Sequence, residues 1–176
     1  MVKITTTAIP MGFIGDAFDF SMEAEVFPER QIAWTYNQDT PLPFGLTMDR
    51  QGKISGVPMW AQQGSVEFIV TTSMPVESQK TLLNMRIYNN LALPDLQFPH
   101  MCAGETFEVK LSAVGGVPPY QWEIDSLPVG LALSSNVIKG VPQVSGGKAP
   151  IKVTVKDHVG HTATRYFTID SRSREE

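Results

Sequence analysis

Two stretches decide the organisation of this chain: Leu42-Pro43-Phe44-Gly45-Leu46-Thr47-Met48, and shortly after it Lys53-Ile54-Ser55-Gly56-Val57-Pro58. Both occur again, as Leu127-Pro128-Val129-Gly130-Leu131-Ala132-Leu133 and Val137-Ile138-Lys139-Gly140-Val141-Pro142. The first halves lie 85 residues apart (127 − 42) and the second halves 84 (140 − 56), so the match survives a one-residue deletion. A repeat of this length indicates two copies of one folding unit in tandem.

Composition favours short strands joined by many turns. The 176 residues include 14 glycines and 13 prolines, and only 18% are charged. The net charge of −4 lacks the basic footprint that sequence-independent nucleic-acid binding requires, so we expect no nucleic-acid partner. No apolar run reaches the 18 residues of a membrane span, so we also expect no membrane insertion.

Alternating apolar and polar residues predict matching strands in the two halves. Phe18, Phe20 and Met22 share one face, as do Phe107, Val109 and Leu111. Tryptophan strands follow at 32–36 and 120–124, and mid-strand tryptophans most often anchor a core. Further strands are predicted at 4–9, at 64–72 with its partner at 147–155 (offset 83), at 83–88 and at 165–169.

The glycines and prolines of the repeat are expected to shape the backbone and not to bind a ligand. Proline lacks an N–H and ends strands, and glycine supplies conformations that a side chain resists. The structural positions of the repeat are Trp34, Leu42, Pro43, Gly45, Leu46, Gly56 and Pro58 in the first copy, and Trp122, Leu127, Pro128, Gly130, Leu131, Gly140 and Pro142 in the second.

About seven short strands per copy, with turns every 8–12 residues, are typical of an immunoglobulin-like sandwich. We therefore predict an all-β chain of two tandem immunoglobulin-like antiparallel β-sandwiches. The first would span residues 1–90 and the second 91–176, including a short polar C-terminal tail. Consecutive hairpins predict that every strand pair is antiparallel.

The succession of Pro-Tyr-x-Trp, Leu-Pro-x-Gly-Leu, a polar turn and Ile-x-Gly-x-Pro resembles the putative-Ig and dystroglycan-type cadherin-like repeats. The resemblance covers residues 3–90 and 91–170. It implies the sandwich fold, and it implies a setting among bacterial surface proteins or phage structural proteins, where such repeats are common.

Some cadherin-like relatives bind calcium between units, and calcium takes 6–8 oxygen ligands. The candidate ligands are Asp95, Glu105 and Asp157, but no dense acidic loop is present. We therefore prefer to interpret them as solvated acidic side chains. The repeat family often carries an aspartate before a glycine turn, which the second copy keeps at Asp157 and the first copy lacks.

The sequence shows no pattern typical of an active site. His100, His158 and His161 fall in no nucleophile motif, although His158 and His161 flank a turn where two imidazoles could share a metal. No phosphate-binding glycine loop or dinucleotide fingerprint is present. Cys102 is the only cysteine, so no disulfide can form within the chain. We predict a non-catalytic protein without a cofactor.

Two functional interpretations remain open. The first is a structural phage virion component (head decoration, tail or baseplate), located on the virion surface; the chain starts without an export signal and has a single cysteine. The second is a spacer or adhesion module of a bacterial cell-surface protein, in which case the sequence given is a segment. The expected partners are other protein subunits, including further copies of this chain, and carbohydrate specificity is left open.

Two aromatic residues outside the repeated core pattern are candidates for contact with a partner: Trp60 and Phe27. Trp60 follows Pro58-Met59, whereas Gln143-Val144 stands at that place in the second copy, so the shared core does not require an indole there. We predict that Trp60 lies at a contact surface or caps the end of its sandwich.

Overall fold

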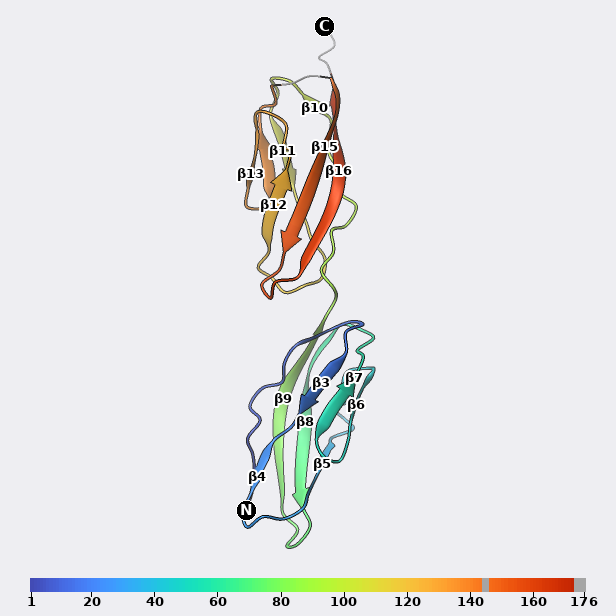
Figure 1. Cartoon of the computed structure of the whole chain (residues 1–176), viewed down its shortest axis with the longest axis vertical. Coiled ribbons are helices and arrows are strands. Elements are labelled where there is room, and N and C mark those ends of the chain that lie inside the picture. The colour runs from blue at the N-terminus through green and yellow to red at the C-terminus, as the bar shows by residue number, and fades with distance from the viewer. Residues whose placement is uncertain (144–145, 173–176) are drawn as a thin grey trace. The chain divides into compact units, whose positions relative to one another are not determined.

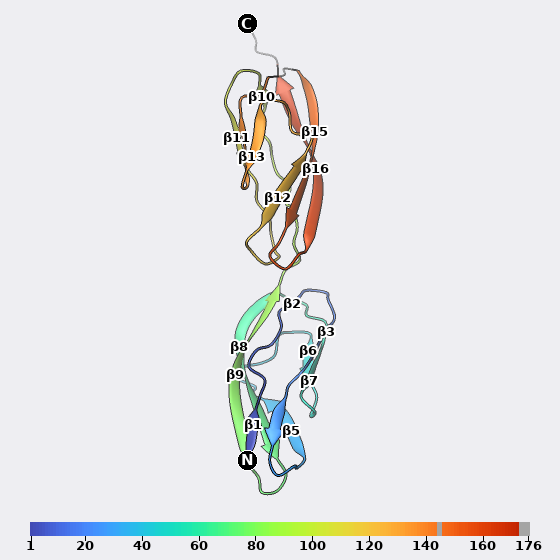
Figure 2. The same ribbon diagram turned by 60° about the vertical axis from the view of Figure 1, so that its left-hand side comes forward.

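A computed structural model describes residues 1–143 and 146–172. These residues form strands and no helix, so none of them forms an apolar helix that could cross a membrane. The chain divides into two compact units, Met1–Asn89 and Asn90–Glu176, and each has its own hydrophobic core. The predicted fold class is confirmed: in each unit two β-sheets lie face to face (Figures 1 and 2). The end of the predicted polar tail, 173–176, lies outside the described residues.

Unit 1 has a four-stranded sheet in the order β2-β9-β8-β5, a three-stranded sheet β3-β7-β6 and a two-stranded pair β1-β4. The bounds are β1 Val2–Ile4, β2 Gly12–Phe13, β3 Phe18–Ser21, β4 Ala24–Val26, β5 Ile32–Tyr36, β6 Leu46–Met48, β7 Lys53–Gly56, β8 Gln62–Thr72 and β9 Ser78–Tyr88.

Unit 2 repeats the two larger sheets, in the orders β10-β16-β15-β12 and β11-β14-β13. The bounds are β10 Met101–Cys102, β11 Phe107–Lys110, β12 Gln121–Asp125, β13 Leu131–Ser134, β14 Val137–Gly140, β15 Gly147–Lys156 and β16 Thr162–Arg172. The segment before β10 already belongs to this unit, because Leu93 is buried in its core and Leu91 packs against it.

The prediction that every strand pair is antiparallel is wrong in one detail. β2 runs parallel to β9, and β10 runs parallel to β16. A hairpin makes two strands antiparallel only when they follow each other along the chain. In each parallel pair, the first strand of the sheet in chain order lies beside the last, so no hairpin sets their direction. The predicted strand at 4–9 is also wrong. The chain forms β1 at Val2–Ile4, which pairs with β4, and after Pro10 it forms β2 in the four-stranded sheet.

The register of the tryptophan strands corrects one predicted alignment. Trp34 pairs with Val70 and Trp122 pairs with Val155, so β8 and β15 correspond at an offset of 85 (155 − 70), not 83. The two-residue difference leaves the inward face unchanged, because side chains alternate with a period of two. With the offset of 85, Thr72 of unit 1 is equivalent to Asp157 of unit 2 (157 − 72 = 85).

The repeated glycines lie where two backbone segments touch. Gly45 has φ +95°, and a Cβ there would stand 2.1 Å from the carbonyl oxygen of Val57. Gly56 has φ +137°, and its Cβ would stand 2.1 Å from the oxygen of Gly45. Gly130 and Gly140 repeat this reciprocal contact in unit 2. Any side chain at these positions would collide with backbone, which cannot move aside cheaply.

The two tryptophans of the repeat are buried to different extents. Trp34 is 4% exposed within the core of unit 1. Trp122 packs against the core of unit 2 but is only half-buried. Both tryptophans contact the core of their unit, as expected for core anchors, but Trp122 keeps part of its surface exposed.

We expect Gly45→Ala to destabilise unit 1 strongly. The left-handed backbone alone costs about 1–3 kcal/mol, and the contact with Val57 adds to that cost. Gly15→Ala is the matched control, because Gly15 has φ +81° but no neighbouring atom within 4 Å of the place where a Cβ would stand. Thermal unfolding followed by tryptophan fluorescence measures both variants.

We further propose that residues 1–90 and 91–176 are separate domains, in which case Gly45→Ala should lower only the transition of unit 1. A single transition that shifts as a whole would contradict that proposal. Equal losses for Gly45→Ala and Gly15→Ala would contradict the steric argument.

Candidate interaction surfaces

An exposed aromatic pair stands beside the glycine contact of unit 1. The rings of Phe44 and Trp60 are stacked, with centroids 4.8 Å apart and planes 13° apart. Phe44 is 53% exposed and Trp60 is 63% exposed, and Val57 and Met59 next to them are exposed as well. We call these four residues the Trp60 patch. Isolated exposed apolar residues are ordinary, whereas a contiguous group of them marks a site of interaction.

The backbone beneath the Trp60 patch is fixed by hydrogen bonds. The N–H of Met59 donates to the oxygen of Phe44 (3.1 Å), and the N–H of Val57 donates to the oxygen of Gly45 (3.2 Å). These two hydrogen bonds join the segment that carries Phe44 to the segment that leads to Trp60, and so fix the backbone that positions both rings. A pre-ordered surface loses little conformational entropy when it binds.

Unit 2 has the same backbone arrangement without the aromatic rings. The N–H of Gln143 donates to the oxygen of Val129 (3.0 Å), so these residues correspond to Met59 and Phe44. The counterpart of Trp60, Val144, lies outside the described residues. Sequence reasoning singled out Trp60 but missed Phe44, although the signal was present: valine replaces phenylalanine in the second copy of the motif.

Phe27, the other predicted contact residue, is 79% exposed on the loop after β4. Arg30 joins this loop to the β8–β9 hairpin, because its guanidinium donates to the oxygens of Phe27 (3.3 Å), Met74 (3.4 Å) and Pro75 (3.3 Å). Met74 is also exposed. Phe27 therefore belongs to a second apolar surface at this end of unit 1.

The structure does not bring Phe27 and Trp60 together. Trp60 precedes the first residue of β8, whereas Phe27 is tied through Arg30 to the hairpin after the last residue of β8. An 11-residue strand spans roughly 35 Å. The two predicted contact residues lie at opposite ends of unit 1 and cannot form one small binding surface.

Glu77 anchors the Phe27 end through charge. Its carboxylate lies 3.0 Å from the N-terminal ammonium of Met1 and 3.6 Å from Nη2 of Arg30. The hydrogen bond to the ammonium, helped by both positive charges, lowers the pKa of Glu77. These contacts link the N-terminus and Arg30 to the β8–β9 hairpin.

Asp157 has a structural role in unit 2. Its Oδ1 accepts hydrogen bonds from the N–H groups of Val159 (3.1 Å) and His161 (2.8 Å). Its Oδ2 accepts from the N–H of Val117 (3.0 Å) and lies 3.3 Å from Nδ1 of His161. The side chain is fully buried. Asp157 therefore closes the β15–β16 turn and attaches it to the loop at Val117.

Burial of Asp157 raises its pKa, but the hydrogen bonds from Val117 and His161, with the charge of the imidazole, outweigh burial and leave the pKa below its ordinary value of 3.8. The ionised carboxylate is the form that the fold requires. Thr72 takes this place in unit 1, where its Oγ1 accepts from the N–H of Glu77 (3.0 Å) and donates to the oxygen of Pro75 (2.8 Å).

The other two candidate calcium ligands are placed differently. Asp95 pairs with Nη2 of Arg165 at 3.1 Å, and Glu105 is exposed in the turn after β10. In the described part of the chain, 1–143 and 146–172, no three His, Cys, Asp or Glu residues gather in a way that could hold a metal ion. The pair His158 and His161 likewise gains no third ligand there, and Nδ1 of His161 faces Asp157.

The family model described as "Putative Ig domain" matches this chain twice, over residues 2–85 and 101–172. These two matches cover most of the 176 residues. The chain belongs to the Putative Ig domain family. No curated protein sequence matches it.

Solved structures of tandem immunoglobulin domains share the fold at low sequence identity. Extracellular domains 3–5 of Drosophila OTK align with a TM-score of 0.59 and 12% identity, over 99% of this chain and 62% of theirs. The titin I-band fragment I67–I69 gives 0.59 and 12%, over 99% and 66%. Sidekick-1 immunoglobulin domains 1–4 give 0.58 and 14%, over 99% and 49%. The chain thus spans less than two thirds of each of these structures.

We expect Asp157→Asn to destabilise unit 2 by about 2–3 kcal/mol, because an amide nitrogen would then face backbone N–H donors. Asp95→Asn, at an exposed ion pair, is the control and should cost less than about 1 kcal/mol. Denaturant unfolding measures both.

The pH dependence gives a second readout. The pKa of Asp157 is lowered in the folded state. The carboxylate therefore makes its full contribution to the free energy of unfolding above pH 3.8, the ordinary pKa, and this contribution is lost as the pH falls below 3.8. The stability gap between the native chain and Asp157→Asn should therefore be constant above pH 3.8 and shrink below it. A gap that widens in acid would contradict this role.

Trp60→Ala should leave unit 1 folded. The stacked pair contributes only about 1 kcal/mol to the free energy of unfolding, since both rings are exposed. Trp34→Ala provides the contrast, with an expected loss of about 3–5 kcal/mol for a buried aromatic residue. Circular dichroism and denaturant unfolding report on both variants. If Trp60→Ala unfolds unit 1, Trp60 is a core residue and not a contact residue.

Proposed function

We propose that this chain is a non-catalytic structural protein that docks on a large protein assembly through the Trp60 patch. The stacked, exposed Phe44–Trp60 pair is the observation that carries the proposal. Tryptophan and phenylalanine bury large areas on binding, and aromatic residues dominate the energetic centres of protein interfaces. The braced backbone beneath the pair supports a specific contact.

The assembly that we propose first is a phage virion, with the chain on its surface as a head decoration, tail or baseplate component. The resemblance to repeats of phage structural proteins supports this setting, as does the presence of the aromatic pair in unit 1 alone. A chain of equivalent spacer domains has no need for one domain that carries such a patch.

The alternative is a spacer or adhesion module at a bacterial cell surface, in line with the dystroglycan-type cadherin-like resemblance. One structural neighbour with an adhesion role in its name favours this second candidate: the Down Syndrome Cell Adhesion Molecule, whose eight N-terminal immunoglobulin domains align with a TM-score of 0.55 and 10% identity, over 98% of this chain and 24% of that structure. At these identities the likeness concerns the fold, so it supports the alternative only by analogy.

Photo-crosslinking from position 60 tests the proposal. We expect a chain that carries benzoylphenylalanine in place of Trp60 to crosslink to a structural subunit when bound to purified particles of the parent phage. The same replacement at Tyr166, which is exposed in unit 2 outside the Trp60 patch, should give no such product.

Each product assigns the chain differently. Crosslinks to a virion subunit support the virion role. In a parallel sample with host cells in place of the phage particles, crosslinks to a cell-envelope protein support the surface module. Crosslinks between two copies of the chain show self-association, which light scattering would register as a defined oligomer. Equal products from both positions would contradict a role for the Trp60 patch.

A further inference from the structure

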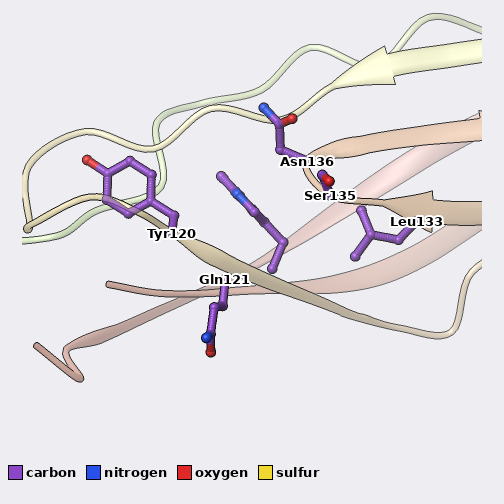
Figure 3. A pocket seen from close by; sticks show the side chains of 6 residues that line it. Tyr120, Gln121, Leu133, Ser135 and Asn136 are labelled. Atoms are coloured by element: carbon purple, nitrogen blue, oxygen red, sulfur yellow. The ribbon is translucent and has the colours of Figure 1, made fainter. Parts of the chain in front are cut away.

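A groove of about 530 Å³ opens beside Trp122 in unit 2. Its walls come from the start of β12 and from the turn between β13 and β14. Figure 3 shows Tyr120 and Asn136 on one side of the β12 ribbon and Gln121 extending from the other. None of the six residues that line the groove is charged: Tyr120, Gln121, Trp122, Leu133, Ser135 and Asn136.

The groove exists because one turn is a residue shorter in unit 2. Five residues separate the paired Met48 and Ile54 in unit 1, whereas four separate Leu133 and Ile138. In unit 1 the longer turn closes over its tryptophan strand, since the N–H of Trp34 donates to the oxygen of Arg50 (2.9 Å). Among the described residues, no backbone hydrogen bond joins Trp122 to the shorter turn of unit 2.

Equivalent turn residues lie differently against the two indoles. Gly52 and Asn136 correspond, because their oxygens accept from the N–H groups of Met22 (2.9 Å) and Leu111 (2.7 Å). A Cβ on Gly52 would stand 2.7 Å from Cδ1 of Trp34, so the turn backbone lies directly on that ring. Unit 2 has a side chain at this place, and Trp122 remains half-buried. The indole of unit 2 is therefore accessible where that of unit 1 is covered.

The polar groups of the groove favour a ligand that donates hydrogen bonds. The hydroxyl of Tyr120 donates to the oxygen of Gly115 (2.7 Å), which fixes the ring and uses the donor. Nδ2 of Asn136 donates to the oxygen of Leu111 (3.0 Å), and because that carbonyl can only accept, the amide orientation is settled. Oδ1 of Asn136 and the exposed hydroxyl of Ser135 are left to accept hydrogen bonds from outside the chain.

We infer that this groove binds a neutral saccharide, with a pyranose ring stacked on Trp122 and its hydroxyls donating to Asn136 and Ser135. A sugar ring combines an apolar C–H face with hydroxyl donors, which is the combination that the groove presents. A proline-rich peptide also fits aromatic grooves, but proline has no N–H to offer to Asn136. The uncharged lining disfavours acidic sugars. The inference concerns unit 2 and is independent of the Trp60 patch.

Titration of the full ¹⁵N-labelled chain tests the inference through its three tryptophan indole resonances. The probes are maltotriose, cellotriose, galactotriose and triacetylchitotriose, each raised to about 20 mM, and decaproline. We expect at least one trisaccharide to shift the Trp122 indole signal, assigned with Trp122→Phe, with a Kd on the order of 1 mM. Decaproline should leave that signal unchanged.

A turn graft gives the matched control. Replacing Ser134–Asn136 with the four-residue sequence of Asp49–Gly52 should close the groove as in unit 1 and weaken binding at least about tenfold. The Trp34 and Trp60 signals should stay in place, which shows that unit 1 is unaffected. Asn136→Ala is a second variant for the case in which the graft does not fold; it removes the acceptor Oδ1 and should weaken binding as well.

Three results would overturn the inference. The first is no shift of the Trp122 signal with any of the four sugars. The second is sugar binding that survives the folded turn graft, which would place the site elsewhere. The third is a Trp122 shift with decaproline and none with sugar, which would identify the groove as a peptide site.

Discussion

The structure depends on one close approach of two backbone segments in each unit. A Cβ on Gly56 would stand 2.1 Å from the carbonyl oxygen of Gly45, and a Cβ on Gly140 would stand 2.0 Å from the oxygen of Gly130. This contact joins the strand after the Leu-Pro-x-Gly motif to the strand before the Gly-Val-Pro motif. It fixes where the following loop leaves the sheet, and in unit 1 that loop carries Val57, Met59 and Trp60 of the Trp60 patch, while Phe44 directly precedes Gly45.

Around this shared contact the two units diverge at places that the core does not constrain. The buried polar position at the end of the long strand is Thr72 in one unit and Asp157 in the other, and each forms a different set of hydrogen bonds with its own turn. The Leu-Pro-x-Gly motif and the loop after the Gly-Val-Pro motif carry aromatic residues, Phe44 and Trp60, only in unit 1. The turn beside the tryptophan is shorter only in unit 2. The two units therefore differ in their surface loops and turns but share the close glycine contact.

The sequence predicts most of this architecture, because the repeat and the alternation of apolar residues depend on local patterns. It predicts less well what depends on pairing between distant segments, such as the parallel β2–β9 pair and the alignment of β8 with β15. The role of Asp157 follows from backbone groups at Val117, 40 residues away, which no local pattern reveals. The exposure of Trp122 has one signal in the sequence, because the repeat offset falls from 85 to 84 across the turn. The sequence does not show that the missing residue leaves Trp122 uncovered, since this depends on how the turn packs against the tryptophan strand.

The parallel pairing of first and last strands also determines how unit 2 would respond to tension. Met101 and Cys102 of β10 lie beside Ser171 and Arg172 of β16, and the two strands run in the same direction. A pull on the two ends of the unit would slide these strands past each other, so their hydrogen bonds would bear the load together and not open one after another. Within the described residues, this parallel contact comprises two residue pairs. Its length sets the force that unit 2 can carry before β10 detaches, and lengthening β10 is the simplest way to raise that force.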